Sequence, residues 1–441
     1  MAVSRKAASV RLDVERVVLP NGLVLLVSEN HSSPSISISA IVRAGSRFEP
    51  DEKAGLASLA GELIEEGTTA RTSQQIAESI DSAGGHLMTF GDYQSSRVAV
   101  LSLARDFNLG LDIASDMLMN AAFPEDKVRQ QIDKRVAQIK SRLDVPRTQA
   151  SDVFNEIVFK GTPQHRPSVG YEETVNALTR SDILGFYDRY YVPNNTVLAI
   201  AGDIDTRETI ARVDSALGKW QRVGGFALPE VSWPHLDAEA VEKCVAAPKE
   251  QVNMFMGHVG IRRKDPDYHA LLVMDTILGS SPGFTSRIPR ILRDEQGLAY
   301  STFANITSSA GLDPGRFVAY IGTAPANLDR ARAGLRGEIA RIVEEGVTAE
   351  ELDIAKSYLT GSFVLRFQRN GQVAEFMLEA EIYDLGFDYL EKYPELIRAV
   401  TVDEVNRVTR KHIHPERLTT VVVGPIDQTG RIISKEESHE S

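Results

Sequence analysis

The sequence predicts an α+β protein of two homologous domains, each with an antiparallel or mixed sheet packed on one side by helices. Two observations carry this prediction. Residues 178–205 align without gaps with residues 400–427, and both segments have the pattern of a capped helix, a proline and a short buried strand that ends at a glycine. In addition, each half begins with strand patterns and continues with long helical stretches, which is typical of an α+β fold.

The repeat is most specific at the start of its helix. Thr179 and Asp182 in the first copy, and Thr401 and Glu404 in the second, have the spacing of a capping box. In that arrangement a hydroxyl and a carboxylate satisfy free N–H groups of the first helical turn. Because both segments use the same device at the same place, two copies of one domain explain the pattern best.

The first half opens with a hairpin pattern at residues 17–27, around Asn21 and Gly22. In residues 35–42 the apolar side chains of Ile36, Ile38, Ala40 and Val42 fall on one face of an extended chain, which predicts a half-buried antiparallel strand. The remaining elements expected in this half are a strand at 96–103 and helices at about 53–66, 73–83, 106–119 and 125–143.

The second half predicts strands at 251–257, 299–305 and 315–323, helices at 267–278 and 284–294, and long helices after them. Between the halves, residues 225–245 are polar and contain glycine and proline, as expected of a linker. The predicted domains are therefore residues 1–224 and 246–430. A flexible tail rich in serine, glutamate and lysine is expected at 431–441.

Composition narrows the functional class. The formal net charge is -12, which argues against nucleic acid or an anionic membrane surface as the partner. No apolar run is long enough to span a bilayer, and no signal-peptide pattern opens the sequence, so we expect a soluble protein of the cytoplasm or the periplasm. Cys244 is the single cysteine, and it can form neither an internal disulfide nor a thiolate metal cluster.

Two adjacent motifs in the first half bring a family resemblance. The motif R-A-G-S-R-x-E occupies residues 43–49, and a helix pattern that begins A-G-L-A and ends in G-T follows at 54–68. Together they resemble the insulinase/pitrilysin family of metallopeptidases, the inverzincins, and the resemblance extends over about residues 14–430. Members of that family carry H-x-x-E-H on this helix. Two histidines four residues apart share a helix face and bind one zinc ion, while the glutamate acts as general base.

Carried onto this chain, the resemblance places Ser58 and Glu62 at the two histidine positions, Gly61 at the base position and Gln138 at the position of a further glutamate ligand. A hydroxyl, a carboxylate, a hydrogen and an amide do not make a tetrahedral zinc site, and no base remains. We therefore expect no metal and no cofactor in this chain, and no peptide hydrolysis by the chain alone. Other candidate ligands are better explained as a solvated acidic helix end and as surface or hydrogen-bonded histidines: Glu65, Glu66, His412 and His414.

In the second half, residues 292–301 resemble the family signature L-R-E-x-x-G-L-A-Y-S, with Arg293 and Tyr300 at its paired positions. The resemblance implies that Tyr300 donates to the scissile carbonyl as it becomes an oxyanion, and that Arg293 holds the substrate backbone. A phenol and a guanidinium suit these roles because both present hydrogen-bond donors. The local pattern leaves an alternative open, in which Arg293 interacts with the C-terminal end of a helix and Tyr300 is a half-buried strand residue.

Two further segments are expected at the substrate on the basis of the resemblance. One is a flexible loop of small residues that borders the substrate cavity, and the other is a sheet edge that pairs with an extended peptide. The residues concerned are Gly279, Ser280, Ser281 and Gly283 in the loop, and Gly85, His86 and Leu87 at the sheet edge. Because the zinc motif is missing, a purely structural role for this copy of the edge stays open.

The resemblance therefore implies a non-catalytic subunit of a zinc metallopeptidase. The partner is a homologous chain that carries an intact H-x-x-E-H and the zinc ion, and the two chains close as halves of a clamshell around an extended peptide. The isolated chain is then not an enzyme, whereas the heterodimer is one. Two other classes stay open: a non-proteolytic scaffold that resembles the core proteins of respiratory complexes, and a chamber that binds peptide without cutting it.

Overall fold

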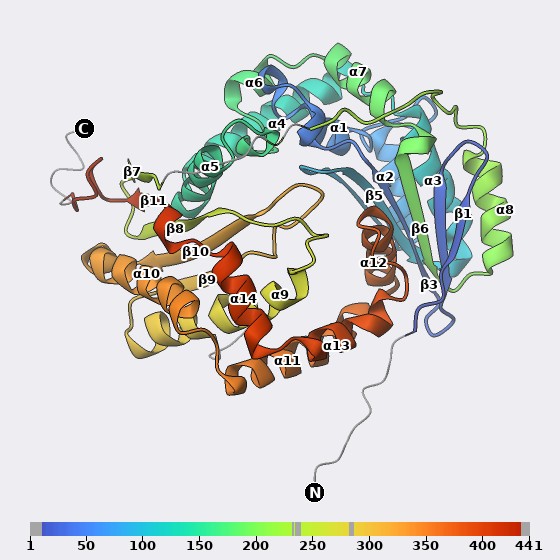
Figure 1. The fold of residues 1–441 in the computed structure, drawn as a ribbon. Helices are drawn as coiled ribbons and strands as arrows, with labels where there is room; N and C mark the ends of the chain where they lie inside the picture. Colours follow the sequence, from blue (N-terminus) through green and yellow to red (C-terminus); the bar gives the residue numbers. More distant parts are fainter. Residues whose placement is uncertain (1–10, 232, 234–239, 282–285, 434–441) are drawn as a thin grey trace, which may run out of the picture. The chain divides into compact units, whose positions relative to one another are not determined.

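The computed structural model describes residues 11–231, 233, 240–281 and 286–433 (Figure 1). They fall into two compact units. The first consists of residues up to 139 together with 167–231 and 363–393, and the second consists of residues 140–166, 232–362 and 394 onward. Each unit holds one sheet covered by helices, which confirms the predicted α+β class.

The two units do not coincide with the two halves of the sequence. Helix α5 (Pro146–Val158) packs against β8 and β11 of the second sheet, and α12 (Asn370–Ile382) packs against β3 and β6 of the first (Figure 1). Each of these helices belongs to the unit whose sheet it covers. Each half of the sequence therefore contributes one helical segment to the unit that is formed mainly by the other half. The boundaries expected for the two repeated domains, 1–224 and 246–430, remain a prediction.

The first sheet has six strands in the order β1-β2-β6-β3-β5-β4. Neighbouring strands are antiparallel except β2 and β6, which are parallel. The expected hairpin is present, because Val18 pairs with Val24 and Gly22 takes the positive φ of 90° that the tight turn requires. The strands are β1 (Glu15–Val18), β2 (Val24–Glu29), β3 (Ser35–Val42), β4 (His86–Gly91), β5 (Ser96–Leu103) and β6 (Thr196–Gly202).

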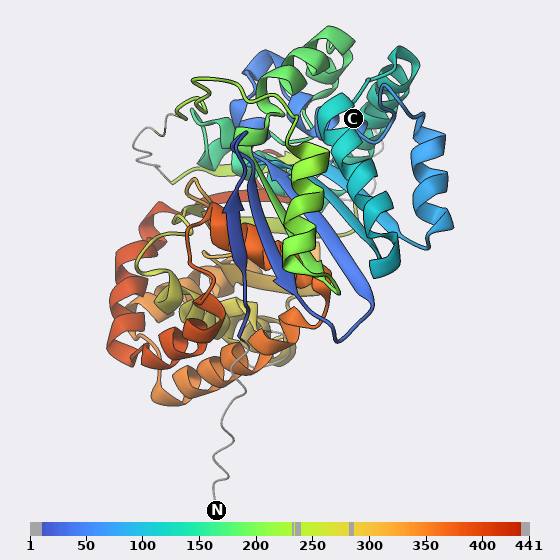
Figure 2. The same cartoon turned by 90° about the vertical axis from the view of Figure 1, so that its right-hand side faces the viewer.

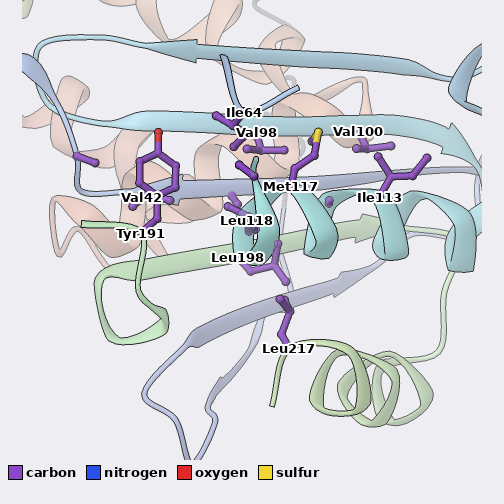
Figure 3. Packing of buried hydrophobic residues seen from close by; sticks show 14 of the residues in the cluster. Val42, Ile64, Val98, Val100, Ile113, Met117, Leu118, Tyr191, Leu198 and Leu217 are labelled. Atoms are coloured by element: carbon purple, nitrogen blue, oxygen red, sulfur yellow. The ribbon is translucent and has the colours of Figure 1, made fainter. Parts of the chain in front are cut away.

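Strand β3 is a central strand with both faces covered, so the prediction that it is half-buried was wrong. Its face with Ile38 and Val42 belongs to an apolar core that also contains Met117 and Leu118 of helix α3. Figure 3 shows Val42, Met117 and Leu118 in this core. On its other face, Ile41 joins a second cluster with residues of α12. The sequence of the strand alone cannot show that a helix more than 300 residues further along the chain covers its small polar side chains.

The helices of the first unit gather on the face of the sheet opposite to α12. Figure 2 looks onto this side, where α3 and α8 lie side by side over the strands. Most of these helices match the predicted positions within a few residues. They are α1 (Leu56–Leu63), α2 (Ser73–Ser82), α3 (Phe107–Asn120), α4 (Glu125–Leu143, whose last turn belongs to the second unit), α6 (Glu172–Asn176), α7 (Arg180–Tyr190) and α8 (Thr206–Leu217).

The second sheet has five strands in the order β7-β11-β8-β10-β9, with β7 and β11 parallel and the other neighbours antiparallel. Its core on the α5 side contains Phe154, Phe255 and Tyr320, whose rings contact one another through Phe255. The strands are β7 (Glu242–Ala246), β8 (Val252–Val259), β9 (Ser301–Asn305), β10 (Arg316–Thr323) and β11 (Thr419–Gly424).

The structure confirms the internal repeat. Thr179 caps α7 and Thr401 caps α14 (Val402–His412), each through the same capping box. The strand that follows, β6 or β11, lies in each sheet between one parallel and one antiparallel neighbour. Strands β4 and β9 take equivalent places, since each is the last strand at the same edge of its sheet.

The remaining helices of the second half agree with the prediction except near residue 280. The expected helix at 267–278 is α9 followed by a π-helical segment, η6, which includes residues 279 and 280 of the predicted loop. Of the expected helix at 284–294, residues 284 and 285 lie outside the described residues. No described helix is long and apolar enough to cross a membrane. The bounds are α9 (Tyr268–Asp275), η6 (Thr276–Ser280), η7 (Pro289–Glu295), α10 (Leu328–Glu344), α11 (Ala349–Phe363) and α13 (Tyr389–Ala399).

Candidate functional site

The helix that carries the expected metal positions is short and firmly anchored. Gly55 starts α1 with a φ of 100°, which a residue with a side chain rarely adopts. The buried carboxylate of Glu49 then accepts hydrogen bonds from the backbone N–H groups of Gly55 (2.9 Å) and Ala57 (2.7 Å), and so satisfies donors of the first turn. Helix α1 lies against β4 and β5, with Ser58 and Glu62 turned toward α4.

The space between Ser58 and Glu62 is filled by a guanidinium group. Arg135 of α4 is only 2% exposed, and its Nη1 donates to Ser58 Oγ at 2.7 Å. Its Nη2 forms an ion pair with Glu62 Oε2 at 2.7 Å, in which the N–H bond does not point straight at the oxygen. Gln131, one turn earlier, donates to the same Glu62 oxygen at 3.1 Å. Ser58 Oγ in turn donates to the carbonyl of Ser168 at 2.6 Å, so this hydroxyl both accepts and donates a hydrogen bond.

The base position is closed by the backbone. A Cβ atom at Gly61 would lie 2.8 Å from the backbone nitrogen of Gly91 in β4 and 2.8 Å from Ser96 Oγ in β5. Real Cβ atoms do not approach backbone atoms that closely, so β4 would have to move to admit any side chain. With β4 in its present position, there is therefore no room at residue 61 for the side chain of a glutamate base.

The residues at the expected metal site do not fit a zinc ion. Zinc in such sites is bound by histidine, cysteine or carboxylate ligands arranged as a tetrahedron. This site offers one carboxylate and one hydroxyl, and both already contact the guanidinium of Arg135. Gln138 is exposed, and the α4 side chains that reach α1 are those of Gln131 and Arg135. Sequence reasoning missed Arg135. Its spacing of four residues from Gln131, opposite an acidic residue of α1, was the available signal.

The acidic end of α1 is less solvated than expected. Glu66 pairs with Lys127 of α4 at 3.1 Å. Glu65 is half-buried, and burial raises the pKa of its carboxyl above the usual value, with the charges of Glu66 and Glu62 adding to the effect. The hydroxyl of Thr89 and the charge of Lys134 oppose these effects.

Strand β4 is the edge strand that the sequence predicts. Among the described residues it pairs with β5 on one side only, and Met88 is 46% exposed in its middle. A groove of about 410 Å³ opens beside the first residues of the strand. It is formed by the end of α1, the inner side of α2 and the start of β4. Its lining residues are Glu65, Glu66, Ser73, Gln74, Ile76, Ala77, Ile80, Asp81, Gly85, His86 and Leu87.

The paired Arg293 and Tyr300 both come before edge strand β9 in the second unit. Arg293 lies in the last turn of η7, a π-helix, and its Nε donates to Asp294 Oδ1 at 3.0 Å. Tyr300 directly precedes β9, where its backbone N–H donates to Gly322 O at 2.9 Å and leaves the side chain 65% exposed. The alternative of a half-buried strand aromatic is therefore wrong for Tyr300, whereas Arg293 does sit at a helix C-terminal end.

The small-residue segment before η7 is tied to the same strand. A Cβ at Gly279 would lie 2.3 Å from the backbone nitrogen of Ala304 in β9, so only glycine fits there. Ser280 Oγ donates to the carbonyl of Ala304 at 2.8 Å. Residues 279 and 280 are thus part of the packed η6 helix and not of a flexible loop. Ser281 is half-buried, and Gly283 lies outside the described residues.

The histidines near residue 412 are held by protein groups. His412 Nε2 lies 2.9 Å from Asp267 Oδ2, a carboxylate that also accepts hydrogen bonds from Arg407 and Lys411. The backbone N–H of His414 donates to Nε2 of the buried His258 at 3.2 Å. These contacts agree with the expected hydrogen-bonded histidines.

Comparisons with known proteins identify the family of both halves of the chain. A family model described as "Insulinase (Peptidase family M16)" matches residues 24–172, and one described as "Peptidase M16 inactive domain" matches residues 177–359. An "uncharacterized zinc protease" of Mycobacterium leprae is 28% identical over 96% of this chain and 94% of its own length. A protein of the same description from Streptomyces coelicolor is 28% identical over 94% of this chain and 90% of its own.

Solved structures show the same fold. A "peptidase M16 inactive domain" of Pseudomonas fluorescens superposes with a TM-score of 0.88 at 22% identity, over 94% of this chain and 98% of that one. A chain of Complex III2 from Candida albicans gives a TM-score of 0.77 at 18% identity, over 95% of this chain and 97% of that one. With both halves matched by models of one family, the chain belongs to the insulinase family, peptidase family M16.

Proposed function

We propose that this chain is the non-catalytic subunit of a heteromeric zinc metallopeptidase. A homologous partner chain with an intact H-x-x-E-H would supply the zinc ion and the general base, and this chain would supply Arg293 and Tyr300. The observation that carries the proposal is the contrast between the two units. In the first, Arg135 fills the space between Ser58 and Glu62 and the backbone of Gly91 closes the base position at Gly61, whereas in the second the side chain of Tyr300 is exposed at a sheet edge.

The chemistry asked of this pair is modest and suits its surroundings. When water attacks a peptide carbonyl, negative charge develops on the oxygen, and a phenol held nearby can donate a hydrogen bond to it. Tyr300 is free to present its hydroxyl because its position is fixed through its backbone and not through its ring. Arg293, on the helix that leads into the same strand, offers forked N–H donors to a peptide carbonyl.

Peptide cleavage by the two chains together tests the proposal. The partner chain alone should cleave an extended peptide slowly, and addition of this chain should raise the rate. Tyr300→Phe should then lower kcat by about 10²–10³, the usual cost of removing one donor to an oxyanion. Arg290→Ala, in the same helix as Arg293 and paired with Glu295, is the matched control for Arg293→Ala. Unchanged rates for both Arg293→Ala and Tyr300→Phe would rule the proposal out.

A scaffold without proteolytic function is the second candidate, and the likeness of fold to a chain of Complex III2 favours it. A scaffold would need the buried Arg135 only to stabilise the first unit, and it would not need Arg293 and Tyr300 for its function. A complex purified from the source cells separates the two candidates. The scaffold predicts no chain with H-x-x-E-H among its components and no zinc, whereas the peptidase subunit predicts both.

A further inference from the structure

We propose that Arg287 is a positioning residue for Arg293 and Tyr300, and that it acts through its forked ion pair with Glu351. This proposal rests on the proposed function and deepens it, because it names the contact that would hold the two substrate-facing side chains in place. Arg287 would not touch the substrate. It would fix the start of η7, the helix that carries Arg293 and leads to Tyr300.

The helix η7 is of a kind that needs support from its neighbours. It is a π-helix, and the chain leaves it through a turn at Gly297 with a φ of 63° before it reaches Tyr300. π-Helices are rare, occur in short pieces and are frequent at functional sites. Since most of the stability of a protein helix comes from packing against other elements, the position of η7 depends on what holds it.

Arg287, in the turn directly before η7, ties this helix to the connection between α10 and α11. Its Nε donates to Glu351 Oε1 at 2.6 Å, and its Nη2 donates to Glu351 Oε2 at 2.7 Å and to the carbonyl of Gly346 at 2.8 Å. Two parallel bonds from a planar guanidinium fix orientation as well as distance. Glu351 is itself held in the first turn of α11, because its Oε2 also accepts from the N–H of Thr348 at 2.9 Å.

Buried contacts along the segment connect this fixed start to the proposed substrate residues. Leu292, directly before Arg293, is fully buried, and a Cβ added to Gly334 of α10 would lie 2.6 Å from its Cδ2. Leu298, two residues before Tyr300, is also buried, and its N–H donates to the carbonyl of Leu292 at 2.8 Å. Each residue of the pair therefore follows a buried leucine closely, and a shift of η7 would move both of them.

Fold stability alone gives little reason for a charged pair at this place. Arg287 is 7% exposed and the side chain of Glu351 is 26% exposed, so both groups lose much of their hydration. Replacing a buried ion pair by apolar residues is often neutral for stability, whereas the pair fixes a geometry that apolar contacts leave loose. Arg290 on the same helix differs, because it pairs with Glu295 of η7 itself and both side chains are exposed.

Hydrogen exchange of the full-length chain, without any partner, tests the positioning role. The variants are Arg287→Met, Glu351→Gln and the matched control Arg290→Met. Glutamine also serves in a capping box, so Glu351→Gln removes the ion pair and keeps the start of α11. We expect the amides of residues 290–300 to exchange about tenfold faster in Arg287→Met and in Glu351→Gln, and at the wild-type rate in Arg290→Met. Unchanged exchange in β8 and β10 shows that the variants are folded.

Peptide cleavage by the complex with the H-x-x-E-H chain gives a second readout. Arg287→Met should lower kcat/KM about tenfold, because a small misplacement of a catalytic group is costly. In a chain that carries both Arg293→Ala and Tyr300→Phe, the same change should lower kcat/KM no further, since its effect passes through those two residues. A merely structural role of Arg287 would give the same loss in both backgrounds.

The proposal is overturned by wild-type exchange of residues 290–300 in both Arg287→Met and Glu351→Gln, by equally fast exchange in Arg290→Met, or by equal losses of kcat/KM in the two backgrounds. If Arg287→Met does not fold, Glu351→Gln decides. Failure of the proposed function is distinguishable, because it appears as unchanged cleavage with Arg293→Ala and Tyr300→Phe. The exchange measurement depends neither on the partner nor on cleavage.

Discussion

Replacing Arg135 by methionine tests whether its guanidinium takes the structural place of a metal ion between α1 and α4. Methionine keeps much of the side-chain volume and removes the charge and the donors. The change leaves Glu62 without its ion-pair partner and Ser58 without one hydrogen bond, although Ser58 still donates to Ser168. The perturbation is therefore electrostatic and confined to the first unit.

The size of the effect follows from burial. Removing one member of a buried ion pair costs about 3–5 kcal/mol, because the other charge is left without compensation. Here Arg135 is 2% exposed but the Glu62 side chain is 33% exposed, so water can solvate part of the freed carboxylate. We therefore expect a loss of about 2–3 kcal/mol in the free energy of unfolding of the first unit.

The two tryptophans allow the first unit to be followed by itself. Trp220 lies in the core of the first unit, and the partly buried Trp233 packs against that of the second. In a Trp233→Phe background, urea unfolding monitored by fluorescence thus reports on the first unit. Arg129→Met, at an exposed position of α4, is the matched control and should change the unfolding free energy by less than about 0.5 kcal/mol.

A double-mutant cycle completes the test. In a Glu62→Gln background the cost of Arg135→Met should fall by about 1 kcal/mol or more, because no unpaired charge is then left. If Arg135→Met is as stable as Arg129→Met, or if it costs as much in the Glu62→Gln background as in the chain that keeps Glu62, the guanidinium does not have the role assigned to it.

Other predictions concern packing and pH. Gly61→Ala should destabilise the first unit by about 1–3 kcal/mol, because the added methyl group would contact β4. Gly185→Ala, in the middle of α7 where no atom lies close, should be neutral or stabilising. Urea unfolding compares the two variants, and equal stability would contradict the close packing at Gly61. Burial lowers the pKa of His258 to about 4, so the folded state holds the ring neutral while the unfolded chain gains a proton below about 6.5. The contribution of the neutral His258 to the stability of the second unit is then fully present above pH 6.5 and is lost as the pH falls toward 4, by up to about 3 kcal/mol. His258→Gln should flatten this dependence, and an unaltered slope would refute the assignment.

Local patterns in the sequence predict most of the elements, because capping boxes, turn glycines and apolar periodicity act over a few residues. Thr179 and Thr401 cap their helices as expected, and the hairpin turns at Gly22. The prediction failed for β3, since its burial depends on α12 from far along the chain. Such contacts leave no trace in the strand itself.

The sequence predicted that the metal ligands and the base are missing from the candidate site, but not which groups take their place. The positions of Ser58, Gly61 and Glu62 follow from the family motif, but the motif does not say that Arg135 occupies the space between them. The reason that Gly61 has no side chain lies in the backbone of Gly91, thirty residues away in the sequence. Close approach between two backbones is a property of the packed structure. The exposure of Tyr300 was likewise decided by the sheet edge at β9.

Zinc analysis of the purified chain, before and after it is combined with its H-x-x-E-H partner, tests the central claim most directly. Both samples are incubated with zinc and dialysed, and bound metal is counted per chain by mass spectrometry. Our account predicts that this chain retains no zinc by itself, because Arg135 fills the site between Ser58 and Glu62, and that the active complex retains zinc in an amount equal to the partner chain. Zinc retained by the lone chain in an amount equal to the chain itself would contradict the account.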